Sequence, residues 1–320
     1  MADTFGKSWR TLRAHCPLAP PLLARFWTET AYRKFCDRRN WSFLRGEDEF
    51  LINTQNTGTV DVTRGSATVS GGSMAYNLSD MDRQFMVGGR GPVYTIISVN
   101  DKVDYTLDRP YGGTSATATS ASVLDAYLTM PADFRRFIAV LDPANNWQLH
   151  LWVTEEELNT WDAQRSSTGT PWAIVSRRLK TQGTTSLIGR IQYELWPYAT
   201  SNKNYPYYYQ KGPSENIMDE DALLGPLSTN VNLLVTLALA EAAEWPGSGD
   251  QRNPYFNLSL ANAKREMAER EASRLEVVDE EIYSTWLESI SWLNRYSFSP
   301  IDSRYLQSHD SSIYNGFSGW

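Results

Sequence analysis

The sequence of 320 residues has few of the residues that build metal centres and disulfide scaffolds. It contains two cysteines, Cys16 and Cys36, and three histidines that lie far apart, His15, His150 and His309. Two cysteines cannot form a metal framework or a disulfide-rich scaffold, and the histidines have none of the spacings of a zinc site. The two cysteines flank a predicted helix, so we expect two reduced thiols in the core.

Long apolar runs are also missing. The best run, Val231 to Ala243, includes Asn232 and Glu241 and is too short to span a bilayer. The first residues lack the apolar segment of a signal peptide. We therefore expect synthesis and folding in a cytoplasm, with no membrane partner.

The usual catalytic motifs do not occur. The sequence has no zinc-protease, Cys-x-x-Cys, nucleophile-elbow or phosphate-loop pattern. The glycine-rich stretch Val87–Pro92 precedes a predicted strand, which favours a turn over a phosphate site. The acidic clusters Asp80/Asp82, Glu155–Glu157 and Glu280/Glu281 could supply an acid and a base, but helix-end and surface charge explain them more simply. We predict a protein that is not an enzyme and needs no cofactor.

Aromatic residues are abundant, with 12 Trp and 17 Tyr. Such a surplus fits either a rich core or a large interface, and the sequence leaves both open. The net charge of −7 disfavours general binding of nucleic acid. The basic stretch Arg33–Arg45 could still meet an acidic partner or passing DNA, but a solvated helix face or a protein partner is the preferred interpretation.

The N-terminal part has the periodicity of an amphipathic helix. After Pro20 and Pro21, which suit a first turn, an apolar residue recurs every fourth position until the predicted end near Asn40. This stripe contains Leu23, Trp27, Ala31 and Phe35, and Leu22 and Phe26 are expected to widen it.

From Glu49 the pattern becomes that of strands. Val60 and Val62, a turn at Arg64-Gly65, and Ala67 with Val69 predict a hairpin. Short strands at steady spacing favour a β-sandwich or barrel-like insert. The further predicted strands are Val93–Val99, Asp104–Leu107, Phe137–Val140, Gln148–Val153, Trp172–Arg177 and Ile188–Leu195.

After Pro213 the sequence again predicts helices. Ser228 is the expected cap of a helix that is apolar almost all round and ends at Trp245–Gly247. A second helix follows Pro254. The residues expected to form the helical contacts are Leu233, Leu234, Leu237, Leu258 and Leu275.

The last stretch mixes small polar residues with aromatic and aliphatic ones. We interpret it as an extended arm that docks on a partner, with a disordered end as the alternative. Its candidate docking residues are Phe298, Ile301, Tyr305, Leu306, Ile313, Tyr314, Phe317 and Trp320.

Together these patterns predict an α+β fold. N- and C-terminal helices form a helical bundle, a large antiparallel β-sandwich or barrel-like domain is inserted between them, and an extended C-terminal arm follows. The predicted boundaries are 1–48 and 213–297 for the bundle, 49–212 for the insert and 298–320 for the arm.

The order of several motifs resembles that of head-to-tail adaptor (connector) proteins of tailed bacteriophages. The resemblance covers about Pro20 to Val278 and includes a late Ala-rich helix. The motifs, after the helix with Tyr32 and Trp41, are Thr57–Gly71, Leu128–Phe134, Gly169–Trp172, Leu195–Pro197 and Tyr207–Pro213.

The resemblance implies a structural protein of the virion. Such adaptors form a ring, usually a dodecamer, below the portal protein, and DNA passes through it without sequence readout. The family's arm, which reaches into the portal, would correspond to Phe298–Trp320, and its ring helices to Ser228–Glu244 and Asn253–Val278. The other side of the ring would receive the next neck or tail protein (stopper, nozzle or tail tube), and assembly would occur in the host cytoplasm.

Three other interpretations stay open. A carbohydrate-binding tail-fibre or receptor module could use Trp147, Trp152, Trp161 and Trp172 as stacking platforms. A cell-wall-cleaving tail enzyme would need a carboxylate pair. A stand-alone cytoplasmic protein would be a stable monomer.

Overall fold

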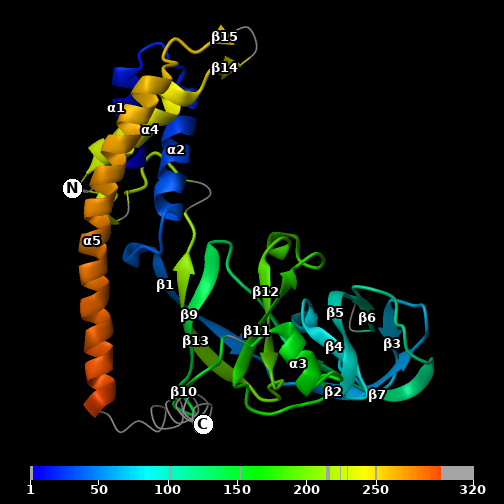
Figure 1. The fold of residues 1–320 in the computed structure, drawn as a ribbon. Coiled ribbons are helices and arrows are strands. Elements are labelled where there is room, and N and C mark those ends of the chain that lie inside the picture. Colours follow the sequence, from blue (N-terminus) through cyan, green and yellow to red (C-terminus); the bar gives the residue numbers. More distant parts are fainter. Residues whose placement is uncertain are drawn as a thin grey trace, which may run out of the picture. The chain divides into compact units, whose positions relative to one another are not determined.

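The computed structural model describes residues 3–100, 103–151, 153–213, 217–223, 225–228, 230–248 and 251–296, with only the backbone at 248, 251 and 280–296. The fold is mixed α+β, as the sequence predicts. Contacts divide the chain into a helical unit, Met1–Gly46 with Gln210–Trp320, and a β-rich unit, Glu47–Tyr209. The first contains α1, α2, α4 and α5, and the second most of the strands (Figure 1). The candidate arm, 298–320, lies outside the described residues.

The helical unit is organised around α4 (Val231–Glu244), which packs on α1 (Phe5–His15), α2 (Pro21–Asp37) and α5 (Leu258–Tyr296). One core joins these helices, and Cys16 and Cys36 are buried in it as reduced thiols, as predicted. The unit also holds two short 3-10 helices, Ser42–Leu44 and Gly225–Ser228, and the strand pair β14 (Gly247–Ser248) and β15 (Gln251–Arg252).

Two details of the predicted helices are wrong. The cap of α4 is Asn230, whose side chain accepts a hydrogen bond from the Leu233 N–H. Ser228 instead closes the preceding 3-10 turn, where its hydroxyl donates to the Gly225 carbonyl. On α2 the predicted stripe of Trp27, Ala31 and Phe35 is buried, but Leu22 and Phe26 are exposed, because they lie about half a turn away from it.

The β-rich unit begins with a closed barrel. Its strands follow the order β2, β3, β6, β5, β4, β7 and pair antiparallel. A buried apolar cluster with Val60, Val69, Phe85 and Ile96 fills the barrel. The barrel strands are β2 (Asn56–Val62), β3 (Thr68–Ser70), β4 (Gln84–Val87), β5 (Arg90–Asn100), β6 (Asp104–Leu107) and β7 (Ala116–Leu124).

Two open sheets complete the β-rich unit. One has the order β1 (Arg45–Ile52), β13 (Lys203–Lys211), β9 (Phe134–Asp142), β10 (Trp147–Gln148). The other has the order β11 (Ala173–Leu179), β12 (Ile191–Trp196), β8 (Tyr127–Thr129), with α3 (Glu155–Trp161) against β11. The predicted strand Gln148–Val153 is wrong beyond Gln148, because the described residues among Leu149–Val153 make only an isolated bridge at His150.

Many of the aromatic residues are buried in the cores of the two units. Tyr94, Tyr105, Tyr198 and Tyr205 are fully buried, as is Trp41. Phe134 stacks on Tyr209 with ring centroids 5.5 Å apart and meets Phe137 edge-on. Of the two explanations that the composition left open, a rich core therefore accounts for much of the tyrosine.

Candidate functional site

Of the predicted contact residues in the helices, four face the core. Leu233 and Leu234 are buried, and Leu237 and Leu275 are partly buried against the same core. Leu258 is 55% exposed and does not belong to this core. It occupies the first position of α5, before the alanine stripe of this helix, in which Ala261 is buried and Ala268 and Ala272 pack in the core.

An apolar stripe on the outer side of α2 is exposed. Leu18, which precedes the helix, is 75% exposed, Leu22 is 81% exposed and Phe26 is 60% exposed. The spacing of four residues places Leu22 and Phe26 on one face, away from the buried face of Trp27 and Ala31. Exposed apolar side chains that gather on one face are candidates for an interaction surface. We call Leu18, Leu22 and Phe26 the α2 stripe.

A second exposed apolar stripe runs along α5. Leu260, Met267 and Val278 are all exposed and lie about two and three turns apart, on one side of the helix. This side flanks the alanine stripe that packs on the core. We call these three residues the α5 stripe. The helical unit thus carries two different apolar surfaces.

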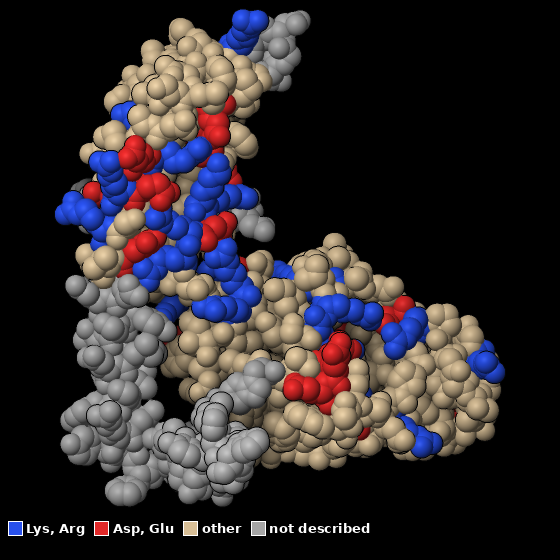
Figure 2. Space-filling view, viewed as in Figure 1, with Lys and Arg blue, Asp and Glu red and all other residues tan. Residues whose placement is uncertain are grey.

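Ion pairs connect the basic end of α2 to the acidic side of α5. Arg38 donates to Glu269 and Glu276, and the Arg39 guanidinium lies 3.8 Å from the buried Asp279. The carboxylates around Arg38 raise the pKa of its guanidinium against the opposing effect of burial. Basic and acidic side chains alternate over this face in Figure 2. The basic stretch is therefore largely neutralised by neighbouring helices.

A polar cavity of about 170 Å³ opens in the β-rich unit. Its walls come from β5, the segment after β6, β8, α3 and β11, which are far apart in the sequence. In Figure 2 acidic side chains over α3 lie next to basic ones. The lining residues are Val93, Thr95, Asp108, Arg109, Tyr127, Glu155, Arg177 and Arg178.

Arg177 connects this cavity to a buried carboxylate. Its guanidinium lies 3.4 Å from Glu194, which is fully buried and also accepts hydrogen bonds from Arg165 at 2.8 Å and from the Tyr198 hydroxyl at 2.7 Å. Burial and the negative charge of Glu194 raise the pKa of Tyr198, so the phenol stays protonated. Burial raises the pKa of Tyr127 at the cavity wall as well. Glu194 lay on the face of a predicted strand, but no pattern showed that its side chain is buried.

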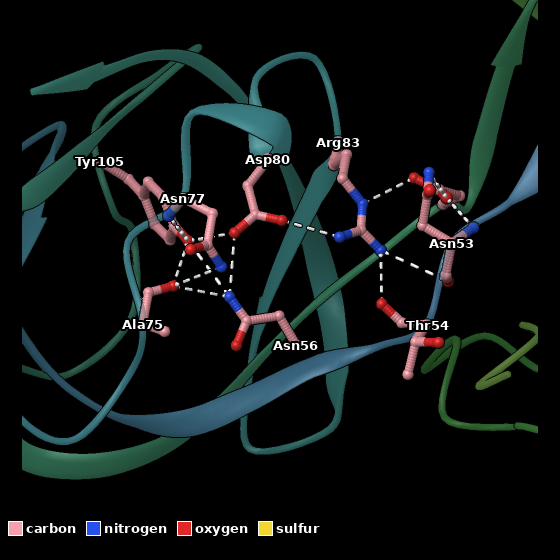
Figure 3. Close-up of polar contacts among 9 residues, drawn as sticks. Asn53, Thr54, Asn56, Ala75, Asn77, Asp80, Arg83 and Tyr105 are labelled. Carbon is pink, nitrogen blue, oxygen red and sulfur yellow. Dashed lines mark hydrogen bonds and ion pairs between the residues drawn. The ribbon is translucent and has the colours of Figure 1, made fainter. Parts of the chain in front are cut away.

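A second buried network stabilises the barrel (Figure 3). Asp80, 1% exposed, accepts from the Tyr105 hydroxyl at 2.5 Å, from Asn56 at 2.9 Å and from Arg83 at 2.7 Å. Arg83 also donates to Asp125 at 2.7 Å and to the Thr54 carbonyl. Every member has partners within the chain, which indicates a structural role.

Two of the three acidic clusters have structural roles, and the side chains of the third, Glu280 and Glu281, lie outside the described residues. Glu155–Glu157 form the first turn of α3, as predicted, with a capping box between Thr154 and Glu157. Asp80 is buried in the barrel network, and Asp82 accepts from Lys180 at 2.5 Å and from Thr184. The interpretation of Asp80 and Asp82 as surface charge is therefore wrong. Burial opposes ionisation of Asp82, but Lys180 and Thr184 outweigh it and lower its pKa.

The tryptophans of the carbohydrate-binding interpretation do not form one platform. Trp161, half exposed, lies 5.7 Å from Trp172 and 5.8 Å from Trp196, measured between ring centroids. Trp147 packs against a different cluster, in the core of the four-stranded sheet, and Trp152 lies outside the described residues. Trp196 was not predicted as part of this group.

The part of the chain that the structure describes holds no group of three or more His, Cys, Asp and Glu placed to bind a metal ion. Among the same residues, no helix combines the length and the apolar character needed to cross a membrane. Neither the known protein families nor the curated proteins include a match to this chain.

Proposed function

We propose that this protein is a head-to-tail adaptor of a tailed bacteriophage, a structural virion protein whose copies form a ring between the portal and the next neck or tail protein. The observation that carries the proposal is the α2 stripe. A helix that buries Trp27 and Ala31 on one face leaves Leu22 and Phe26 exposed on the other. The order of sequence motifs that resembles the adaptor family adds to it.

Two different apolar stripes suit a ring better than a symmetric dimer. In a ring each copy uses one surface against its neighbour and a second surface against the neighbour on the other side. We propose that the α2 stripe of one copy packs near the α5 stripe of the next. Within each copy, α4 holds α2 and α5 through a shared core that includes Leu233, Leu234, Leu237 and Leu275. The helical unit would thus form the bundle of the ring.

The proposed arm, from Phe298 to Trp320, supplies the contact with the portal. A few buried aromatic residues carry most of the affinity in interfaces of this kind. The same assembly must let DNA pass without adhesion. The net charge of −7 and the pairing of Arg38 and Arg39 with acidic residues of α5 support that requirement, because these two arginines are neutralised and do not hold phosphates.

The proposal is tested by mixing with the matching portal dodecamer and recording the mass of the complex. Full-length protein should add as a ring, and a chain ending at Ser297 should not. The double variant Leu22→Asp, Phe26→Asp should keep its fold but fail to close a ring. Leu51→Asp, at a leucine of β1 in the other unit that is 53% exposed, is the matched control and should assemble normally. Failure of the full-length protein to bind the portal would overturn the assignment.

A further inference from the structure

The polar cavity of the β-rich unit is lined by more positive than negative charge. Three arginines, Arg109, Arg177 and Arg178, face two carboxylates, Asp108 and Glu155. The volume of about 170 Å³ is below the 300–1,000 Å³ usual for larger ligands, so the cavity admits one compact group. Guanidinium groups bind carboxylates and phosphates through paired N–H donors. The excess of arginine therefore favours an anionic group.

Arg177 is held by its protein partners. It donates to Glu155 and, at 3.2 Å, to the Tyr127 hydroxyl, and its guanidinium lies 5.1 Å from the centroid of the Tyr127 ring. Together with Glu194 behind it, these contacts fix its orientation. Its charge is already balanced, so Arg177 shapes the cavity wall more than it supplies free charge.

The other two arginines have donors to offer. Arg109 donates to the Val93 carbonyl at 2.8 Å and lies over the Tyr94 ring, yet 44% of its side chain is exposed. Arg178 is exposed, and within the described residues it has no ion pair and no hydrogen bond through its side chain. Arg178 and the open side of Arg109 are thus the groups that a ligand can reach.

The two carboxylates that line the cavity, Asp108 and Glu155, restrict the kind of ligand that it can bind. Asp108 lies 3.7 Å from Arg109, and Glu155 pairs with Arg177, so neither carries an unbalanced charge that would attract an amine. Each still has lone pairs that accept hydrogen bonds from hydroxyl groups. Inorganic phosphate has few hydroxyl donors and satisfies these acceptors less completely than a polyhydroxylated ligand does. The walls therefore fit a ligand with one anionic group and several hydroxyls.

We propose that this cavity binds a small polyhydroxylated carboxylate, of the kind that forms the acidic unit of a sugar polymer. Arg178 and Arg109 hold the carboxylate of the ligand, while Asp108, Glu155 and Thr95 meet its hydroxyls. This binding activity is separate from the proposed adaptor role and does not depend on it.

The test is isothermal titration of the full-length protein with three probes, glucuronate, glucose and inorganic phosphate. Glucuronate should bind more tightly than either of the others. Arg178→Gln should weaken glucuronate binding about tenfold, since a charge-assisted hydrogen bond is lost. Because the Arg178 side chain makes no hydrogen bond or ion pair with the described residues, the variant should keep the melting temperature of the parent. Arg64→Gln, at an exposed arginine in a barrel turn, is the matched control and should bind as the parent does.

Each other outcome would overturn the proposal. Glucose binding as tightly as glucuronate would mean that the arginines do not recognise the carboxylate. Phosphate binding as tightly as glucuronate would mean a general anion site that does not recognise hydroxyls. An equal loss of glucuronate affinity in Arg64→Gln and Arg178→Gln would mean that the surface attracts the ligand nonspecifically. If none of the three probes binds, the cavity is not a binding site for this class of ligand.

Discussion

Asp162 shows how one buried carboxylate orders a loop through its charge. It accepts from the backbone N–H groups of Ser166 at 3.0 Å and Ser167 at 2.9 Å, and from the Trp196 indole at 3.1 Å. Burial alone would raise its pKa, but these donors outweigh burial and lower the pKa to about 2. The folded protein therefore holds the ionised form more strongly than the unfolded chain does.

This pKa predicts how stability depends on pH. As the pH falls, Asp162 is protonated in the unfolded chain before it is protonated in the folded protein. The ionised Asp162 therefore contributes fully to the free energy of unfolding above about pH 4, and this contribution is lost as the pH falls toward 2. Asp162→Asn should lower the free energy of unfolding by about 2 kcal/mol at pH 7. In urea titrations the difference from the parent should shrink as pH 2 is approached, whereas the exposed control Glu156→Gln should match the parent throughout. A difference that is constant with pH would contradict this account.

The barrel network gives a second prediction at a single residue. Arg83→Met leaves the buried Asp80 and the partly buried Asp125 without their cation, which costs about 3 to 5 kcal/mol of unfolding free energy. Adding Asp80→Asn should recover part of the loss, because the charge that lost its partner is then removed. The control Arg64→Met changes an exposed arginine and should stay within about 0.5 kcal/mol of the parent in chemical denaturation. A small effect of Arg83→Met would mean that water replaces its guanidinium.

Among the elements, α4 is the helix that holds the core of the helical unit together. Leu234 is fully buried, so Leu234→Ala should cost about 3 kcal/mol and lower the melting temperature of the helical unit. Leu258→Ala, on the exposed start of α5, should cost less than about 0.5 kcal/mol. Circular dichroism at 222 nm follows both variants. Equal destabilisation by the two would mean that Leu258 is covered in solution.

Periodicity located the helices better than it located their faces. The spacing of Trp27, Ala31 and Phe35 predicted α2 and its buried side, but Leu22 and Phe26 are equally apolar and carry no mark of exposure. Likewise Ser228 and Asn230 are both good caps, and only the 3-10 turn that Ser228 closes decides between them. Which face of a helix is buried depends on the elements that pack against it, and the sequence of the helix itself does not show which elements these are.

The pairing of the strands and the residues that line the cavity were harder to predict from the sequence than the helices were. Alternation predicted β2, β5 and β6, but closure of the barrel rests on β2 pairing with β7, whose sequence of small polar residues was not recognised as a strand. The cavity brings Arg109, Tyr127 and Arg177 together from three separate segments. No local motif links such residues, because their proximity is a product of the fold.

At the scale of the whole molecule, the chain crosses between its two units only through β1 and β13, which pair with each other. The helical core draws on residues up to Leu44 and again from Ile217 onward, while every other buried cluster lies between Ile52 and Tyr209. No buried apolar cluster among the described residues spans both units. Separate cores are the physical condition for separate folding.

We therefore predict that residues 47–209 fold when expressed alone and that the full chain unfolds in two transitions. The fragment should melt cooperatively, at a temperature that matches one of the two transitions by calorimetry. Matched core variants assign the transitions: Val140→Ala should shift only the one that the fragment reproduces, and Leu234→Ala only the other, because each removes methyl groups from one core. A single transition that both variants shift equally would mean that the strands β1 and β13 couple the two cores into one cooperative unit.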